Sequence, residues 1–343
     1  MKPIGATIFA CSRSIVLLSV LFVLMAAQAA PVCAGRIALV VGNSKYENLS
    51  AAQQLKSPKH DAREIARALK ILGYKVYRAS RHEDAGINVT RKGFYRLWTR
   101  FKRTIEPGDV VLFYYSGHGL ASEGSNFLIP GDIDELPGGD IEDTTDFLKK
   151  NAISLGGLID EFQRTSKKLE RKGRNGRRGG AHGIFIVDAC RNAPTSSDGR
   201  KSFGGALSGM APVRHPTGIF VMYSAELGQT SLDRLGHNDA NPYSLYTRKL
   251  LPFLTEKYAI LNLSDLAQIL RVQVYNEALR KLNKRGVIVG HRQSPAYYDG
   301  LLTRRTILGD EPPDIKAARL VDQLWKGLKP GVRTPKQLSQ RTN

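Results

Sequence analysis

The chain has 343 residues, of which 42% are hydrophobic and 24% are charged, so its composition is that of a globular protein and excludes a disordered chain. A chain of this length can bury a large core in one or two domains. The formal net charge of +20 is unusually high and favours an anionic partner or surface.

The first 34 residues have the layout of a secretory signal peptide. Lys2 and Arg13 precede an apolar run that ends near Ala27. Small residues follow the run, which predicts cleavage after Ala29 or Ala34. Because the run is shorter than the ~20 residues needed to cross a bilayer, a cleaved signal peptide is favoured. The alternative is an uncleaved membrane anchor. We therefore expect an exported protein, periplasmic or secreted, or one held at the membrane if the segment is retained.

The cysteines are informative because so few remain after export. Of Cys11, Cys33 and Cys190, the first leaves with the signal peptide, and the second leaves too if the later site is cut. Exported proteins usually pair their cysteines or avoid them. An unpaired Cys190 in an oxidising compartment therefore indicates a nucleophile.

From residue 36 onward, short apolar strands alternate with amphipathic helices. The predicted strands are 36–43, 74–80, 109–119, a short hairpin arm at 126–132, 182–190, 217–225 and an edge strand at 294–300. The predicted helices are 61–72, 90–105, 154–170, 244–256 and 263–283. The first of these helices begins with an Asp-x-x-Glu capping pattern and ends at Gly73.

This alternation predicts an α/β protein whose mostly parallel sheet is covered by helices on both faces. In such sheets, function gathers at the carboxyl ends of the strands. His118 lies just past the end of one predicted strand and Cys190 at the end of another. The connection between these strands is predicted to hold one helix, so that the strands can be neighbours and the two side chains can meet.

A thiol and an imidazole at this place suit nucleophilic catalysis. An imidazole activates a thiol by favouring its thiolate or by taking its proton. Gly117 and Gly119 flank His118 and permit tight turning and close approach of a substrate backbone. The amides of Gly119 and Cys190 are candidates for the oxyanion hole of an acyl-transfer reaction.

Five segments, in this order, resemble the caspase-like cysteine peptidases, with the bacterial metacaspase-type branch the closer match: "ALVVGNSKYEN", "HDAREIARALKILGY", "FYYSGHG", "FIVDAC" and "YSAELGQTSLD…NPYSLYTRKLL". The resemblance covers about residues 36–301. It implies that Cys190 is the nucleophile and His118 the general base and acid of a dyad that hydrolyses peptide bonds. It also implies a caspase-haemoglobinase three-layer α/β sandwich around a six-stranded, mostly parallel sheet.

The same resemblance divides the chain into parts. It implies a peptidase domain at 35–303, with a large-subunit-like part at 35–191, a linker at 192–216 and a small-subunit-like part at 217–303. Residues 304–343 form a tail that we expect to lie outside the main core.

The resemblance further implies a substrate pocket. In metacaspase-type relatives, acids matching Asp61 and Asp188, with the serine matching Ser116, line the pocket for the residue before the cut. Two carboxylates there favour Arg or Lys through charge-assisted hydrogen bonds. For Asp61, a helix N-cap is the alternative role. Candidate self-processing sites after basic residues in exposed, Gly-rich segments are Arg177, Arg178, Arg200 and Lys201.

The remaining partners are constrained by what the sequence lacks. An acidic stretch, which comprises Asp132, Asp134, Asp140, Glu142 and Asp143, does not match an EF-hand loop. We therefore predict no metal or other cofactor, with calcium as the alternative because some metacaspases bind it.

Export and the lack of aromatic-interleaved basic patterns argue against nucleic acid. Attraction to an anionic envelope surface remains open, as does the oligomeric state. The alternative to an enzyme is a catalytically inactive caspase-fold binding module.

Overall fold

Three apolar runs form the centre of a parallel sheet. They are β1 (Arg36–Gly42), β4 (Val110–Ser116) and β8 (His182–Asp188), and β4 lies between the other two. Nearly all of their residues are buried, as expected for parallel strands that have helices on both faces. The computed structural model describes residues 35–137, 141–176, 179–189, 217–255, 261–283, 285–301, 308–309, 321 and 323–324.

The sheet extends from this centre in the order β10-β9-β8-β4-β1-β2. Strands β9 (Ile219–Tyr223) and β2 (Lys75–Val76) run parallel to their neighbours, whereas β10 (Ala296–Asp299) is an antiparallel edge. The short β3 (Gly86–Ile87) pairs with the end of β1. The predicted mostly parallel sheet is therefore confirmed, with six strands on its main path and β3 as an addition.

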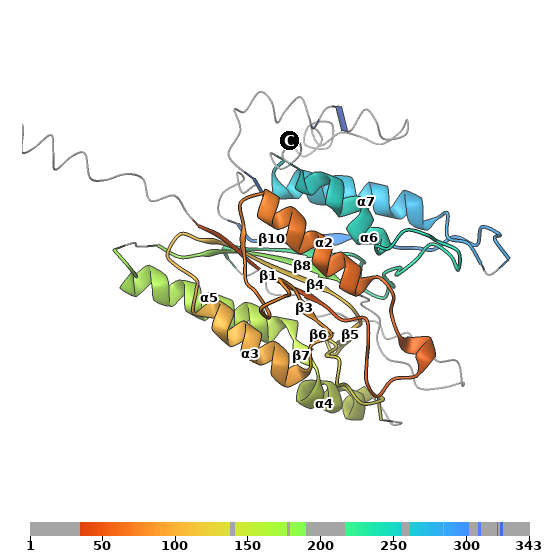
Figure 1. Cartoon of the computed structure of the whole chain (residues 1–343), viewed down its shortest axis with the longest axis horizontal. Helices are drawn as coiled ribbons and strands as arrows, with labels where there is room; N and C mark the ends of the chain where they lie inside the picture. The colour runs from red at the N-terminus through yellow and green to blue at the C-terminus, as the bar shows by residue number, and fades with distance from the viewer. Residues whose placement is uncertain are drawn as a thin grey trace, which may run out of the picture. The chain divides into compact units, whose positions relative to one another are not determined.

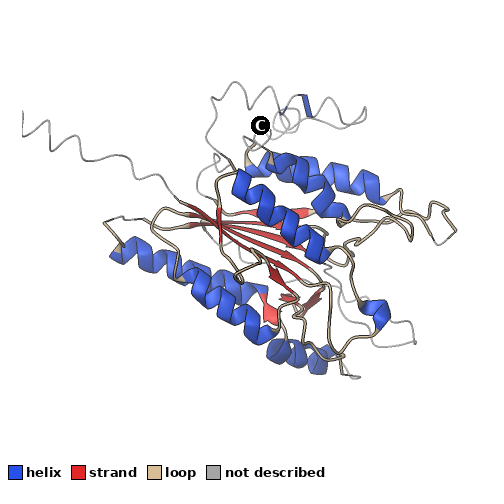
Figure 2. Ribbon diagram, viewed as in Figure 1, coloured by secondary structure: helices blue, strands red, loops and turns tan. Residues whose placement is uncertain are grey.

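Helices cover both faces of the sheet (Figures 1 and 2). One face carries α2 (Pro58–Ile71), α6 (Leu245–Leu250), the 3-10 helix η2 (Leu251–Leu254) and α7 (Leu263–Ala278). The other face carries α3 (Arg91–Lys102) and α5 (Leu155–Lys172). Successive strand residues serve opposite cores, so that Leu112 packs with the first group and Phe113 with the second. This is the predicted three-layer sandwich.

The connection between β4 and β8 is more elaborate than the sequence predicts. It contains a three-stranded sheet of β5 (Gly119–Ser122), β6 (Ser125–Leu128) and β7 (Ile153–Ser154), and a helix α4 (Ile141–Asn151) before α5. The prediction of a single helix in this connection is wrong. The acidic start of α4 masks its narrow apolar stripe, in which Leu148 is buried. The predicted pairing of β4 with β8 is confirmed.

Helix α2 begins earlier than predicted. Its N-cap is Ser57, and Pro58 occupies the first turn, where its missing N–H costs no hydrogen bond. The predicted start at Asp61 is wrong, and so is the alternative that Asp61 caps the helix. Asp61 lies inside the first turn with its side chain directed into the protein and 0% exposed.

Part of the C-terminal tail belongs to the core. Leu308 is buried in the cluster formed by α2, α6 and α7, and the Arg36 guanidinium donates a hydrogen bond to the Gly309 carbonyl. The expectation that the tail lies outside the core is therefore wrong at these positions. The predicted signal peptide (1–34) and linker (192–216) lie outside the described residues. Within the described ranges, no helix has the length and apolar character required to span a bilayer.

Candidate active site

The register of β4 with β8 places the two motif-bearing strand ends side by side. Ser116 and Asp188 are Cα partners, and the Gly117 amide donates to the Asp188 carbonyl at 3.2 Å. His118 follows Ser116 by two residues, and Cys190 follows Asp188 by two. The strands are thus in phase up to Asp188, and Ala189 is the last described residue before Cys190. Cys190 itself lies outside the described residues.

Two tyrosines hold the backbone of His118. The His118 amide donates to Tyr46 Oη at 2.7 Å, and its carbonyl accepts from Tyr115 Oη at 2.9 Å. The Tyr46 and His118 rings also pack against each other, with centroids 4.7 Å apart. Tyr46 Oη in turn donates to the Asn43 carbonyl at 3.0 Å. The tyrosine hydroxyl therefore uses both its donor and an acceptor lone pair to join the end of β1 to the histidine.

A main-chain carbonyl orients the His118 ring. Nε2 lies 2.6 Å from the carbonyl oxygen of Gln53. Because a carbonyl oxygen only accepts, Nε2 must carry a hydrogen, which makes Nδ1 the acceptor nitrogen of the neutral ring. Burial lowers the pKa of His118, although the Gln53 carbonyl and Asp233 partly offset this effect. The ring is therefore a neutral base at pH 7, with Nδ1 as its basic atom.

The segment that presents the Gln53 carbonyl is itself held by side-chain hydrogen bonds. Gln53 ends the short 3-10 helix η1 (Ala51–Gln53), and its Oε1 accepts from the amide and the hydroxyl of Ser50. Gln54 Oε1 accepts from the Tyr46 amide at 2.8 Å, and its Nε2 donates to the Leu49 carbonyl at 2.8 Å. These bonds fix the loop that follows β1 on both sides of the carbonyl.

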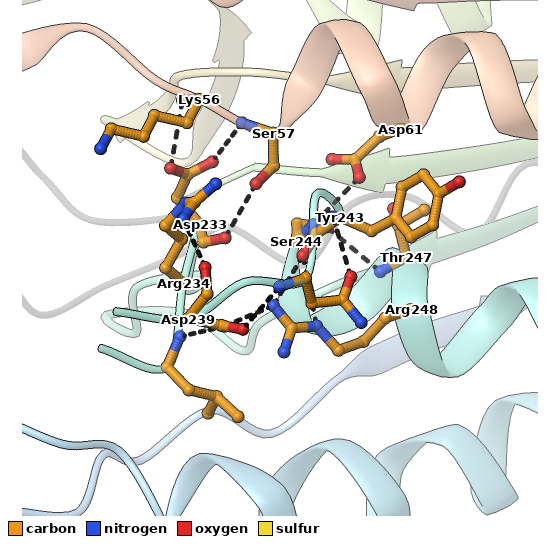
Figure 3. A network of polar contacts seen from close by, with 12 residues as sticks. Lys56, Ser57, Asp61, Asp233, Arg234, Asp239, Tyr243, Ser244, Thr247 and Arg248 are labelled. Carbon is orange, nitrogen blue, oxygen red and sulfur yellow. Dashed lines mark hydrogen bonds and ion pairs between the residues drawn. The ribbon is translucent and has the colours of Figure 1, made fainter. Parts of the chain in front are cut away.

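Asp61, Ser116 and Asp188, the three residues predicted to form the substrate pocket, come together at the same sheet edge. Asp61 Oδ2 accepts from Ser116 Oγ at 2.8 Å, and its Oδ1 accepts from the Ser244 amide at 3.0 Å. All three predicted side chains are buried. Figure 3 shows Asp61 facing Ser244 and Thr247 across this site.

Asp188 is saturated by hydroxyl donors. Its Oδ1 accepts from Ser231 Oγ at 2.8 Å, and its Oδ2 accepts from Thr247 Oγ1 at 2.9 Å and from Ser244 Oγ. Ser244 is also the N-cap of α6, where its oxygen accepts from the Thr247 amide. The loop after β9 and the start of α6 thus close over the carboxylate.

The two carboxylates are electrostatically unfavourable in this enclosed site. Burial raises the pKa of Asp61 well above its ordinary value, and the neighbouring Asp188 raises it further. Burial also raises the pKa of Asp188, although hydrogen bonds from Ser244, Ser231 and Thr247 offset part of the shift. A buried cation would relieve both carboxylates, because an opposite charge favours the ionised form.

Sequence reasoning missed the residues that support this site. Those that hold the histidine are Tyr46 and the Gln53 carbonyl, and those that hold the carboxylates are Ser231, Ser244 and Thr247. Only Ser244 carried a usable signal, because a serine precedes the helical run "LYTRKLL". Gly119 begins β5 directly after His118. The candidate self-processing residues Arg177, Arg178, Arg200 and Lys201 lie outside the described residues.

The acidic stretch takes part in local structure. Asp132 Oδ1 accepts from the Arg91 amide at 2.7 Å, Asp134 Oδ1 accepts from Asn48 Nδ2 at 2.7 Å, and Glu142 and Asp143 lie in the first turn of α4. Asp140 is outside the described residues. Among the side chains that are described, no three His, Cys, Asp or Glu residues are grouped as metal ligands.

Solved structures share this fold. Caspase-1 from Spodoptera frugiperda aligns with a TM-score of 0.54 at 15% identity, over 81% of this chain and 92% of that one. The structure titled pro-sf-caspase-1 aligns over the same shares with a TM-score of 0.50 and 13% identity. The architecture is therefore that of the caspase-like α/β sandwich.

The family follows from the sequence comparison. The model of the caspase domain of peptidase family C14 matches residues 35–307, so the chain belongs to this family of peptidases. A "Probable protease" of a Desulfuromonadales bacterium is 28% identical over 160 residues, which is 44% of this chain and 16% of that protein. Human mucosa-associated lymphoid tissue lymphoma translocation protein 1 is 28% identical over 47% of this chain and 16% of its own length. The matches thus span about a sixth of these relatives.

Proposed function

We propose that the protein is an exported cysteine endopeptidase in which Cys190 is the nucleophile and His118 the general base. The observation that carries the proposal is the in-phase pairing of Ser116 with Asp188. Neighbouring strands lie about 4.8 Å apart, and each reactive residue follows its strand partner by the same two positions. The thiol and the imidazole would therefore leave the sheet together.

The chemistry would run in two halves. Nδ1 of neutral His118 takes the thiol proton while the sulfur attacks the peptide carbonyl carbon, and the amides of Gly119 and Cys190 stabilise the resulting oxyanion. His118 then gives the proton to the departing amine, which leaves a thioester on Cys190. A water molecule, deprotonated by His118, attacks the thioester and releases the acid and the free thiol. The Gln53 carbonyl stabilises the imidazolium in each half.

The buried acidic pair favours cleavage after Arg or Lys. A cationic side chain that reached Asp61 and Asp188 would replace hydroxyl donors with charge-assisted hydrogen bonds and would lower both raised pKa values. An aspartate at that position would add a third negative charge. The resemblance to metacaspase-type peptidases supports the same assignment.

One assay tests the mechanism and the specificity together. Purified protein is incubated with fluorogenic peptides that end in Arg, Lys or Asp, beside Cys190→Ala. We expect turnover of the Arg and Lys peptides and none in the variant. Undiminished turnover by Cys190→Ala would refute the nucleophile, and turnover of the Asp peptide alone would refute the pocket. No turnover of any peptide would favour the binding module.

Self-processing follows from the same specificity. The wild-type chain should accumulate fragments on storage, whereas Cys190→Ala should stay intact. Mass spectrometry of the new termini should place the cuts after the candidate residues, which are Arg177, Arg178, Arg200 and Lys201. Identical fragments from the variant would indicate a contaminating protease.

Envelope attachment is a second candidate activity, supported by a basic groove of about 820 Å³ along α3. Six of its lining residues are cationic, namely Arg91, Lys92, Arg96, Arg100, Arg103 and Lys150, and Asp132 is its one acid. The apolar face of α3 is already buried through Phe94, Trp98 and Phe101, so binding would be electrostatic. Co-sedimentation with anionic, but not zwitterionic, vesicles at low salt would support this role, and equal binding to both would refute it.

A further inference from the structure

A second cleft adjoins the candidate active site. It has a volume of about 750 Å³ and lies between the loop that follows β1, the first turn of α2 and the segment from Arg234 to Pro242. Tyr46, which packs on the His118 ring, forms part of its wall. Gln54, the residue after the one that binds His118 Nε2, forms another part. A peptide that reaches His118 therefore passes close to this cleft.

The cleft is basic. Its cationic lining residues are Lys45, Lys56, Lys59 and Arg234, joined by His60, and its one acid is Glu47. Among the described residues, none of the three lysines has a carboxylate partner within 4.0 Å. The Arg234 guanidinium donates through Nη1 to the Asp239 carbonyl, whereas its buried Nε has no hydrogen-bond partner within the described ranges. The cleft thus offers lysine charges that no carboxylate of the described residues compensates.

The two walls of the cleft are fastened together by Asp233. Its carboxylate accepts from the amides of Lys56 and Ser57 at 3.1 and 2.9 Å, and Ser57 Oγ donates to its carbonyl (Figure 3). The negative charge of Asp233 is thereby engaged by two main-chain donors. The three lysine ammonium groups stay without a carboxylate partner among the described residues, while the backbone that carries Lys56 is fixed.

The local field is positive at His60. Burial lowers the pKa of this imidazole, and the charges of Lys59, Arg63 and Arg234 lower it further. These cations come from both walls of the cleft. His60 therefore provides a probe, since an anion bound nearby should raise its pKa again.

The cleft and the acidic pair have opposite charge and share helix α2. Lys59 and His60 line the cleft, and the next residue, Asp61, lies in the acidic site. We propose that the cleft binds an acidic side chain of the peptide substrate, next to the basic residue at the cleavage point, with Lys56, Lys59 and Arg234 as its contacts. This inference rests on the proposed peptidase function and adds a preferred substrate class, in which basic and acidic residues are adjacent.

Kinetics with matched peptides test the preference. Two pairs of peptides are compared, all with the same arginine at the cleavage point. In the first pair, the residue just before this arginine is Glu or Gln. In the second pair, the residue just after it is Glu or Gln. We expect kcat/KM to favour Glu by about fivefold in one pair at low salt, and by less at high salt. Lys56→Glu and Lys59→Glu should abolish this ratio. Lys75→Glu, an exposed control on β2, should keep it.

Binding without catalysis provides the second arm. The His60 ring is followed by NMR in Cys190→Ala during pH titration, with His60→Gln used to assign the signal. We expect the Glu peptide, but not the Gln peptide, to raise the His60 pKa. Cleavage of all Arg peptides with no Glu preference and no change at His60 would overturn the cleft proposal alone. A raised His60 pKa without cleavage of any peptide would overturn the peptidase function and leave the cleft as an acidic-peptide site.

Discussion

Replacing Asp61 by asparagine should make the protein more stable and less active. The side chain keeps its shape, so the new Oδ1 can still accept from the Ser244 amide and Nδ2 can donate to Ser116 Oγ, which is able to accept. The bond with Ser116 is thereby reversed in direction rather than removed. The substitution removes a fully buried charge that faces Asp188, and therefore removes the cause of the raised pKa.

The expected gain in stability follows from linkage. Each unit by which a folded carboxyl exceeds its unfolded pKa costs about 1.4 kcal/mol once the pH is above both values. We expect Asp61→Asn to gain on the order of 1 kcal/mol or more at pH 7, which is a rise in Tm of about 2–4 °C. The contribution of Asp61 to wild-type stability should fall as the pH rises above about 3.9, where the unfolded carboxyl ionises before the folded one. The gain should vanish below that pH.

The loss of activity follows from the lost ion pair. A hydrogen bond to a charged group is worth about 1.5–3 kcal/mol, so kcat/KM for an Arg peptide should fall about 10- to 150-fold. Calorimetry from pH 3 to 8 and peptide kinetics measure the two effects. Asp146→Asn, at a side chain that is 65% exposed on α4, is the control and should change neither. A variant less stable than wild type at pH 7, or one with full activity, would refute the reasoning.

Two further substitutions and one pH profile probe the same site. Gly117→Ala would place a Cβ 2.6 and 2.9 Å from the hydroxyls of Tyr115 and Tyr46, which hold His118. We therefore expect kcat to fall about 10- to 100-fold. Unchanged kinetics would contradict the role of the two tyrosines in positioning His118. The acid limb of the kcat/KM profile should have its midpoint below pH 6.5, because burial lowers the pKa of His118; a midpoint above 6.5 would show an imidazolium stabilised at rest. Ser244→Ala removes a helix cap and a donor to Asp188, so thermal unfolding should report a loss of about 1–3 kcal/mol, and an unchanged Tm would show that neither bond contributes.

The sheet was predictable from sequence because its centre is encoded by continuous apolar runs. The predicted strands at 36–43, 109–119 and 182–190 are short β-branched apolar runs, which is typical of buried parallel strands. Short elements were harder to predict: β2 is shorter than the predicted strand at 74–80, the two-residue β3 was not predicted, and α4 begins with acids that suggest a loop. The cap of α2 was misplaced because both Ser57 and Asp61 suit a helix start.

The candidate site was only half visible in the sequence. Asp61, Ser116, His118 and Asp188 were found because they stand in motifs, and the structure brings them to one sheet edge. The main-chain carbonyl that orients the imidazole could not be predicted. Every residue has a carbonyl, and the sequence does not distinguish the one at Gln53 from the others. The hydroxyl groups that donate to Asp188 could not be predicted either. Serine and threonine are common residues, and these three lie 43 to 59 positions away from Asp188 in the sequence.

The phase of β4 against β8 also has a consequence for engineering and for divergence among homologues. A one-residue deletion inside either strand would turn the following side chain to the opposite face and shift it by about 3.3 Å. Insertions in the long excursion between the strands would leave the pairing of Ser116 with Asp188 untouched. Tags, reporters or whole modules should therefore be tolerated at exposed turns of that excursion, such as the one at Glu123, whereas the seven paired positions of the strands should resist any change in length.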